Sequence, residues 1–397
     1  MSGWSASSGS SNASVAGKTV LILGAGTGGL VAAHRLRRML PRQHRVILID
    51  RAPFYSFAPS YTWVMLGKRD TRRISRDLRS LAKKGIEFVM GEVLAIDPAN
   101  KRVTVSERKI EYDYLVVALG ADYSSDEIPG LGQAWTFYHL EGAEGLFERL
   151  QTFASGRVAI AVSALPYKCP AAPYEGALLL DDHFRRRKLR GDVEIQVYTP
   201  ESAPLPSAGA HVGDRVVDLL SDRDIGFTPG VKVAEVDHRS RQMRFEDGTT
   251  AGFDLLIATP VHHCPAVLRQ CGLAADFGWV EVDRETLATR FEDVYAIGDA
   301  TVIPLGDGKA LPKTGVFAHG QAEVVSRNIA AEIGGAAPIW AFGGQGACFM
   351  SSAAGKAAFV AGNFFAEPEP AVRLRGPNRR WHWAKLGFER LWLWRWF

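Results

Sequence analysis

The stretch that decides the fold is Thr19–Leu23, TVLIL, followed at once by the glycine-rich run GAGTGG of residues 24–29. The β-branched and apolar residues predict a buried strand. A helical stretch reaches about residue 40, and a second apolar run over residues 45–49 ends at Asp50. Together these segments predict a βαβ unit whose turn presents backbone N–H groups to a pyrophosphate.

The spacing inside this unit indicates a dinucleotide site. Gly24, Gly26 and Gly29 match GxGxxG between a strand and a helix. Asp50 stands about 20 residues further on, where an acid takes ribose hydroxyls. A glycine-rich turn without a ligand is the alternative, but strand, helix and terminal acid are all in place here.

Two separated segments are expected to build one domain around an insert. Residues 114–119 read as a buried strand closing on Gly120, and residues 294–300, VYAIGDA, resemble the flavoprotein strand whose Asp, here Asp299, lies beside FAD. We assign residues 18–155 and 276–335 to an FAD-binding domain. Residues 1–17 are expected to form a disordered leader, since they lack the basic start and apolar run of a secretory signal.

The insert, residues 156–275, is expected to be a second Rossmann-like domain in an α/β protein. Its predicted elements are strands at 157–163, 193–198 and 253–259 and a helix at 174–187. The turn after its first strand reads ALPYKCP, residues 164–170, with two prolines and no glycine. Such a turn cannot cradle a second dinucleotide, so the nicotinamide site is predicted to be degenerate.

The C-terminal region, residues 336–397, is expected to contain a membrane-binding segment. Residues 371–397 hold seven basic residues against Glu389 alone, whereas the whole chain has a net charge of +4. Half of the ten tryptophans lie there: Trp381, Trp383, Trp392, Trp394 and Trp396. Indole rings favour the membrane–water interface, and basic residues are drawn to an anionic membrane surface. The alternative is that these aromatic residues pack against the protein body or a second subunit.

Other composition signals narrow the function classes. The body outside the tail is nearly neutral, which argues against nucleic-acid binding. The sequence contains no run of about 18 apolar residues, so it predicts no transmembrane helix. Because no export signal is visible, we expect a peripheral protein on the cytoplasmic side of the cell membrane.

The four cysteines carry no CxxC pair, so a metal site is not expected. Residues 262–264, HHC, cannot all point at one ion on a strand end, which favours surface histidines and a buried cysteine. Cys169 lies in the proline-containing turn of the insert. Cys348 lies in GGQGACFM, residues 343–350.

With these cysteines, the sequence resembles sulfide:quinone oxidoreductases and the flavoprotein of flavocytochrome c sulfide dehydrogenase. The resemblance covers about residues 18–370. Its segments are FAPSYTWV (57–64) with Gly67, CPAAPYE (169–175), LPKTGVFA (311–318) and Cys348-Phe349. It implies FAD, a sulfur bridge between Cys169 and Cys348 that hydrosulfide attacks by thiol–disulfide exchange, and electron transfer through FAD to a membrane quinone.

The resemblance also implies site residues. Glu175 corresponds to a proton-shuttle acid, although a first-turn glutamate complementing the helix dipole is an equal alternative. Lys313 is expected near the flavin pyrimidine edge, where a cation stabilises reduced flavin; a solvated loop lysine is the alternative. The full cofactor set is Gly24, Gly26, Gly29, Asp50, Arg51, Pro59, Val93, Gly120, Gly298, Asp299, Lys313 and Gly315. The quinone set is Phe317, Phe349 and Trp381.

Three functions remain open at this point: sulfide oxidation, type II NADH dehydrogenation and a redox-regulated flavoprotein without enzymatic activity. Ala121, Asp122 and Tyr123 stand where quinone-reducing members often carry a third cysteine. The sulfur product, the quinone type, FAD attachment and a possible homo-oligomer also stay open.

Overall fold

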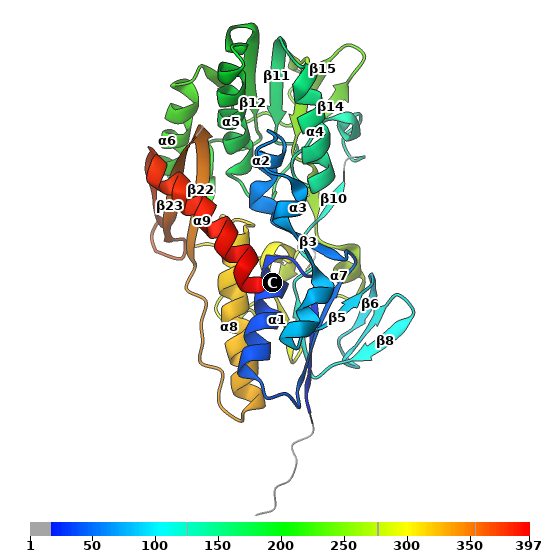
Figure 1. Cartoon of the computed structure of the whole chain (residues 1–397). Coiled ribbons are helices and arrows are strands. Elements are labelled where there is room, and N and C mark those ends of the chain that lie inside the picture. Colours follow the sequence, from blue (N-terminus) through cyan, green and yellow to red (C-terminus); the bar gives the residue numbers. More distant parts are fainter. Residues whose placement is uncertain (1–16, 125, 276–277, 354) are drawn as a thin grey trace, which may run out of the picture.

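The chain has a mixed α/β fold with two lobes, and a C-terminal sheet and helix join them (Figure 1). The computed structural model describes residues 17–124, 126–275, 278–353 and 355–397. All but the last residue of the expected leader therefore lies outside the described residues.

The first lobe contains a five-stranded parallel sheet in the order β20-β9-β1-β2-β5. Its strands are β1 (Thr19–Leu23), β2 (Arg45–Asp50), β5 (Glu87–Met90), β9 (Tyr114–Val117) and β20 (Val294–Ala296). Helices α1 (Thr27–Met39) and α8 (Gly315–Ile333) pack against each other beside it. The strands of a sheet covered on both faces are apolar throughout, as β1 is. β20 follows the insert in the sequence, yet it joins this sheet by pairing with β9.

Short elements extend this lobe and lead out of it. An antiparallel meander is formed by β6 (Val93–Asp97), β7 (Arg102–Val105) and β8 (Arg108–Glu111). Further elements are β3 (Phe54–Ser56), α2 (Tyr61–Val64), α3 (Thr71–Ile74), β4 (Ser75–Asp77), α4 (Leu140–Thr152), β19 (Val280–Glu281) and β21 (Thr301–Val302). The strands that cross between the lobes, β10 (Asp122–Ser124) and β18 (Val261–His263), pair antiparallel.

The second lobe holds a four-stranded parallel sheet in the order β13-β12-β11-β17. Its strands are β11 (Gly156–Ala161), β12 (Val193–Tyr198), β13 (Ile225–Thr228) and β17 (Leu255–Ala258), next to the meander β14 (Val233–Asp237), β15 (Gln242–Phe245) and β16 (Thr250–Gly252). Its helices are α5 (Ala172–Arg186) and α6 (Ala210–Ser221), whereas α7 (Ala266–Gln270) contacts β6 of the first lobe (Figure 1). Asp181 of α5 is fully buried and accepts hydrogen bonds from Arg185, Arg190 and Arg223, which fixes the end of this helix.

One expectation for the crossing strands was wrong. His262 is not a surface histidine: it is buried with its ring against Tyr123 and Tyr138. Burial lowers the pKa of His262 to about 3, so the ring is neutral. His263 is partly exposed and pairs with Glu127, and Cys264 is buried as expected.

The C-terminal region is an antiparallel sheet followed by a long helix. The sheet contains β22 (Gln345–Ala353), β23 (Lys356–Asn363) and β24 (Ala371–Asn378). Asn378 then caps α9 (Arg379–Trp396) by accepting a hydrogen bond from the Trp381 N–H. Helix α9 runs from this sheet across to α1, so it bridges the two lobes (Figure 1). No helix in the described part of the chain is long and apolar enough to cross a bilayer.

Candidate active site

The turn after β1 is shaped by glycines that admit no side chain. A Cβ on Gly24, where φ is 95°, would lie 2.4 Å from the Ala118 carbonyl oxygen, and one on Gly29 would lie 1.8 Å from the Gly24 carbonyl oxygen. Gly26, by contrast, faces open space at the start of α1 and gives the helix no side-chain cap. The first N–H groups of α1 are therefore available to an anion.

Asp50 holds this turn in place from the end of β2. Its carboxylate accepts hydrogen bonds from the backbone N–H groups of Ala25 (2.7 Å) and Ala52 (2.8 Å). Three other predicted cofactor residues lie in neighbouring segments: Arg51 is exposed next to Asp50, Pro59 is exposed in a 3-10 turn, and Val93 starts β6.

A second helix start meets the first. A Cβ on Gly315, at the start of α8, would lie 3.2 Å from Oγ1 of Thr27 in α1. The Thr314 hydroxyl beside it is buried without a hydrogen-bond partner in the described residues. Gly298 and Asp299 lie close by, and the Gly298 N–H donates to Oε1 of Gln321 in α8. Two helix N-termini, an orphaned hydroxyl and an open glycine turn fit the pyrophosphate and flavin ends of FAD.

Lys313 is buried at this junction, so it is not a solvated loop lysine. Its Nζ donates to the carbonyl oxygens of Asp299 (2.8 Å) and Thr301 (2.7 Å) and lies 3.4 Å from the centre of the Trp279 ring. Burial lowers the pKa of Lys313 to about 8, and the Asp299 carboxylate opposes this shift. The group therefore supplies a positive charge near neutral pH that loses its proton more readily than a surface lysine.

The two cysteines of the resemblance line one cavity of about 280 Å³ between the second lobe and the C-terminal sheet. Cys169 has φ of 53°, an uncommon value for a residue other than glycine, and its N–H donates to the Lys313 carbonyl oxygen at 2.7 Å. Cys348 enters from β22. All four cysteines are free thiols. The other walls of the cavity are mainly apolar and include Leu165, Pro166, Leu311, Phe317, Met350 and Val360.

Charges near the cavity act on both thiols. Burial raises the pKa of Cys348 to about 11, and the Glu175 carboxylate adds to this rise while Lys385 opposes it. Burial also raises the pKa of Cys169, followed by the effects of Cys348 and Glu175, again opposed by Lys385. After burial, one carboxylate and one ammonium group therefore act on the acidity of both thiols.

Those two groups form a buried ion pair that the sequence did not predict. Nζ of Lys385 lies 2.6 Å from Oε1 of Glu175 and 2.9 Å from Oγ of Ser351 in β22. Thr62 of α2 donates to the same Glu175 oxygen at 2.9 Å. Glu175 is thus more than a partner of the helix dipole. Its contacts with Thr62 and Lys385, and the bond from Lys385 to Ser351, link α5 with α2, α9 and β22. No sequence spacing links residues 175 and 385; a lone lysine among tryptophans was the sole signal.

An aromatic cluster lies on the other face of β22. Phe349 packs against Phe359 of β23 (ring centroids 5.1 Å apart) and Phe388 of α9 (6.4 Å), and Trp381 stacks on Phe359 at 4.5 Å. Because side chains alternate along a strand, Cys348 and Phe349 face opposite sides of this sheet.

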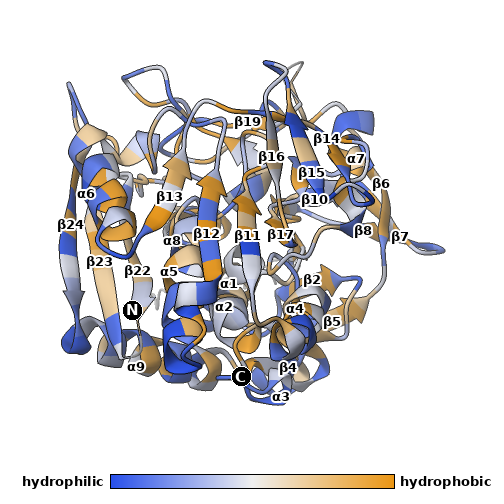
Figure 2. Ribbon diagram, turned by 90° about the horizontal axis from the view of Figure 1, so that it is seen from above, coloured by the Kyte–Doolittle hydropathy of each residue, from blue (hydrophilic) through white to orange (hydrophobic). Residues whose placement is uncertain are grey.

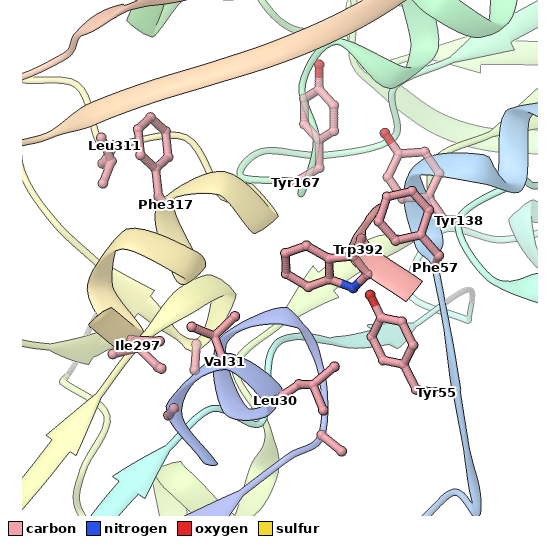
Figure 3. Packing of buried hydrophobic residues seen from close by; sticks show 14 of the residues in the cluster. Leu30, Val31, Tyr55, Phe57, Tyr138, Tyr167, Ile297, Leu311, Phe317 and Trp392 are labelled. Carbon is pink, nitrogen blue, oxygen red and sulfur yellow. The ribbon is translucent and has the colours of Figure 1, made fainter. Parts of the chain in front are cut away.

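Phe317, the third residue predicted for the quinone, is not in this cluster. It lies beside Leu311 on the cysteine cavity, whereas Trp392 packs against Phe57 (Figure 3) and against Phe388 of the aromatic cluster. The structure therefore brings Phe349 and Trp381 together but separates Phe317 from them, because α8 carries it to the cavity side.

The acid that follows the second strand of the second lobe is engaged by protein side chains. Glu201 is buried after β12, and its Oε2 accepts hydrogen bonds from the hydroxyls of Tyr167 (2.9 Å), Tyr174 (2.7 Å) and Thr199 (3.1 Å). Tyr167 belongs to the glycine-free turn after β11. An acid at this position normally holds ribose hydroxyls, but here protein hydroxyls occupy it.

Comparisons with known proteins agree with this geometry. Residues 18–322 match the family described as pyridine nucleotide-disulphide oxidoreductase. The chain belongs to this family. As a member, it is an FAD-dependent oxidoreductase. It is 28% identical to the sulfide-quinone reductase of Aquifex aeolicus over 95% of this chain and 91% of that protein.

Structural similarity points the same way. The crystal structure of the Aquifex aeolicus sulfide:quinone oxidoreductase superimposes with a TM-score of 0.87 at 25% identity, covering 96% of this chain and 91% of that one. Family members that use a nicotinamide are also similar: the type II NADH:quinone oxidoreductase of Haemophilus influenzae is 23% identical over 79% of this chain and 80% of that protein. This chain is thus an FAD-dependent member of its family that is similar over most of its length to sulfide:quinone oxidoreductases.

The glycine-free turn and the engaged acid lead to a first prediction. NADH and NADPH should leave the flavin absorbance of the purified anaerobic enzyme almost unchanged, because neither a glycine turn nor a free acid receives them. Sulfide serves as the positive control on the same sample. Full bleaching at micromolar NADH would contradict this view of the Tyr167–Glu201 contact.

The ion pair leads to a second prediction. Lys385→Gln removes a positive charge near both thiols, so their pKa values rise and iodoacetamide alkylates them several-fold more slowly at a fixed pH below 9. Glu175→Gln should have the opposite effect and move the alkylation profile to lower pH. Peptide mass spectrometry resolves Cys169 from Cys348, and the distant Lys83→Gln is the matched control. Equal profiles for all three variants would contradict the electrostatic link.

Proposed function

We propose that the protein oxidises sulfide and passes the electrons through FAD to a membrane quinone. The observation that carries this proposal is the joint placement of Cys169 and Cys348 on one apolar cavity, with an aromatic cluster on the opposite face of β22. The similarity to sulfide:quinone oxidoreductases supports the same assignment.

On the cavity side, the cysteines carry the sulfur chemistry. In the oxidised enzyme Cys169 and Cys348 form a disulfide. Hydrosulfide attacks one of its sulfurs, so a new S–S bond forms a persulfide on one cysteine while the other leaves as a thiolate. FAD, when bound, accepts two electrons and returns them to the quinone. The net change is HS⁻ plus quinone plus one proton giving a sulfur atom, held by the cysteines, and a quinol.

Part of the cavity lining suits the product. Leu311, Phe317 and Val360 accommodate a chain of uncharged sulfur atoms, while Lys309 and Lys313 on the same cavity supply positive charge for hydrosulfide. We therefore favour retention of a growing sulfur chain on the cysteines over release of each atom singly.

In this proposal, the Glu175–Lys385 pair holds the proton that quinone reduction requires. Ser351 lies on the same side of β22 as Phe349, so the Lys385 ammonium reaches the aromatic side while Glu175 influences the thiols. Phe349, Phe388 and Trp381 provide flat apolar surfaces for a quinone ring and its tail.

The cysteine assignment gives a third prediction. Cys169→Ser should keep FAD bound but abolish flavin reduction by sulfide, because the sulfur bridge cannot form. Cys271→Ser, away from the cavity at the end of α7, is the matched control and should reduce at the parental rate. Stopped-flow measurement of flavin absorbance decides, and a Cys169→Ser protein that is reduced as fast as the parent would rule out the relay.

The outer face of α9 supports peripheral attachment to a membrane. Trp392 and Trp396 are buried against the body, which corrects the expectation that all five tail tryptophans face the membrane. Trp383 and Trp394, in contrast, are 70% and 77% exposed, and Leu391 beside them is 52% exposed. Arg379, Arg380, Arg390 and Arg395 surround this row. A quinone reductase must reach the bilayer, and exposed indole rings among basic residues favour the surface of an anionic membrane.

The membrane assignment gives a fourth prediction, tested with point variants because deletion of α9 would also remove Lys385. Trp383→Ser with Trp394→Ser should weaken binding to anionic liposomes about tenfold or more, since two interfacial indoles are lost. The control pair, Ile339→Ser with Trp340→Ser, removes similar exposed apolar surface elsewhere. Flotation of all three proteins measures the effect, and unchanged binding by the α9 variant would place the contact elsewhere.

A further inference from the structure

A second cavity, of about 500 Å³, lies on the outer surface where α9 ends against the first lobe. Figure 2 shows the end of the chain beside α3 and β4. Four arginines and one glutamate line the cavity together with three apolar side chains: Arg69, Arg73, Arg76, Glu389, Arg390, Leu393, Trp394 and Phe397. The cysteine chemistry uses none of these residues.

The positive charge of this cavity is only partly neutralised. Arg69 pairs with Glu389 at 2.9 Å, and the Ser60 hydroxyl also donates to this glutamate. Arg76 donates to two backbone carbonyl oxygens, those of Arg73 and Ser75, which do not cancel its charge. In the described part of the chain, the guanidinium groups of Arg73 and Arg390 have neither an ion-pair nor a hydrogen-bond partner.

The chemistry of the lining fits a phosphate ester. A guanidinium group offers a fork of N–H donors that matches two phosphate oxygens, and several arginines around one hollow suit an anion with more than two acceptors. The apolar walls, Leu393 and Phe397, have no role in holding a bare inorganic anion. They fit a ligand that carries a hydrocarbon part next to its phosphate.

The position of the cavity identifies the source of that ligand. Trp394 belongs both to its wall and to the exposed row of α9 that contains Trp383 and Leu391. If this row lies in a bilayer, the cavity opens at headgroup level, with acyl chains continuing along Trp394. This step rests on the proposed membrane attachment.

We propose that this cavity, the arginine pocket, binds the phosphate of an anionic phospholipid headgroup. Arg73 and Arg390 hold the phosphate oxygens, Arg76 adds charge, and Leu393 with Phe397 contacts the glycerol part. Bound lipid thereby fixes the end of α9, the helix that also carries Lys385.

The test compares two double variants that each remove one charge from residues 69–80 and one from α9. Arg73→Gln with Arg390→Gln alters the pocket. Arg72→Gln with Arg380→Gln removes exposed charges outside it and is the matched control. Each protein, with FAD content checked, is floated with vesicles of a neutral, phosphate-free galactolipid containing phosphatidylglycerol, or containing oleate at the same surface potential.

The pocket variant should lose at least about tenfold more affinity for phosphatidylglycerol vesicles than for oleate vesicles, a difference of about 1.4 kcal/mol. The control variant should lose affinity equally for both, since it changes long-range attraction alone. Equal losses by the two variants on both vesicles would overturn the pocket while leaving membrane attachment intact. A parent protein that binds neither vesicle would refute membrane attachment itself.

A further arm separates lipid from free phosphate. Millimolar inorganic phosphate, added at constant ionic strength, should leave the parent protein on phosphatidylglycerol vesicles. Release of the parent by phosphate under these conditions would show that the pocket recognises the free anion and would overturn the lipid assignment.

Discussion

The contact between Lys385 and Glu175 is the constraint on which the arrangement of the site depends. It ties the helix that follows Cys169 to the last helix of the chain, and Ser351 and Thr62 bring β22 and α2 into the same contact. A buried ion pair gains little stability over apolar packing, but loss of one partner leaves an uncompensated charge, so such a pair enforces one geometry. The distance between the two cysteines, the tilt of α9 and the electrostatic field at the thiols therefore all depend on it.

Local signals were sufficient for the first lobe. The glycine turn, the buried strand before it and the acid after the second strand are neighbours in sequence, and each has a backbone requirement that few residues satisfy. The same holds for the glycine-free turn of the insert, whose prolines showed that a phosphate loop was absent. Both nucleotide-type sheets and the cysteine cavity follow from such segments and from the family resemblance.

Side-chain contacts between residues far apart in the sequence could not be predicted from such local patterns. The sequence of the tail did not show that Trp392 and Trp396 pack inward while Trp383 and Trp394 face solvent. The rotation of α9 about its axis depends on the ion pairs that Lys385 and Glu389 form with distant residues. The family resemblance grouped Phe317 with Phe349, although α8 and β22 present them to different spaces. His262 was expected at the surface because the sequence did not show Tyr123 and Tyr138 closing over it.

The alternation of β22 has a kinetic consequence. Cys348 and Phe349 are adjacent in sequence, yet a single pleat directs one to the sulfur cavity and the other to the aromatic cluster. Under the proposed function, the donor and the acceptor are held on opposite sides of one strand and need never be bound together, which is compatible with a ping-pong rate law. The separation depends on the register of β22 against β23. A shift by one residue would turn Cys348 toward the aromatic cluster and Phe349 toward the cysteine cavity.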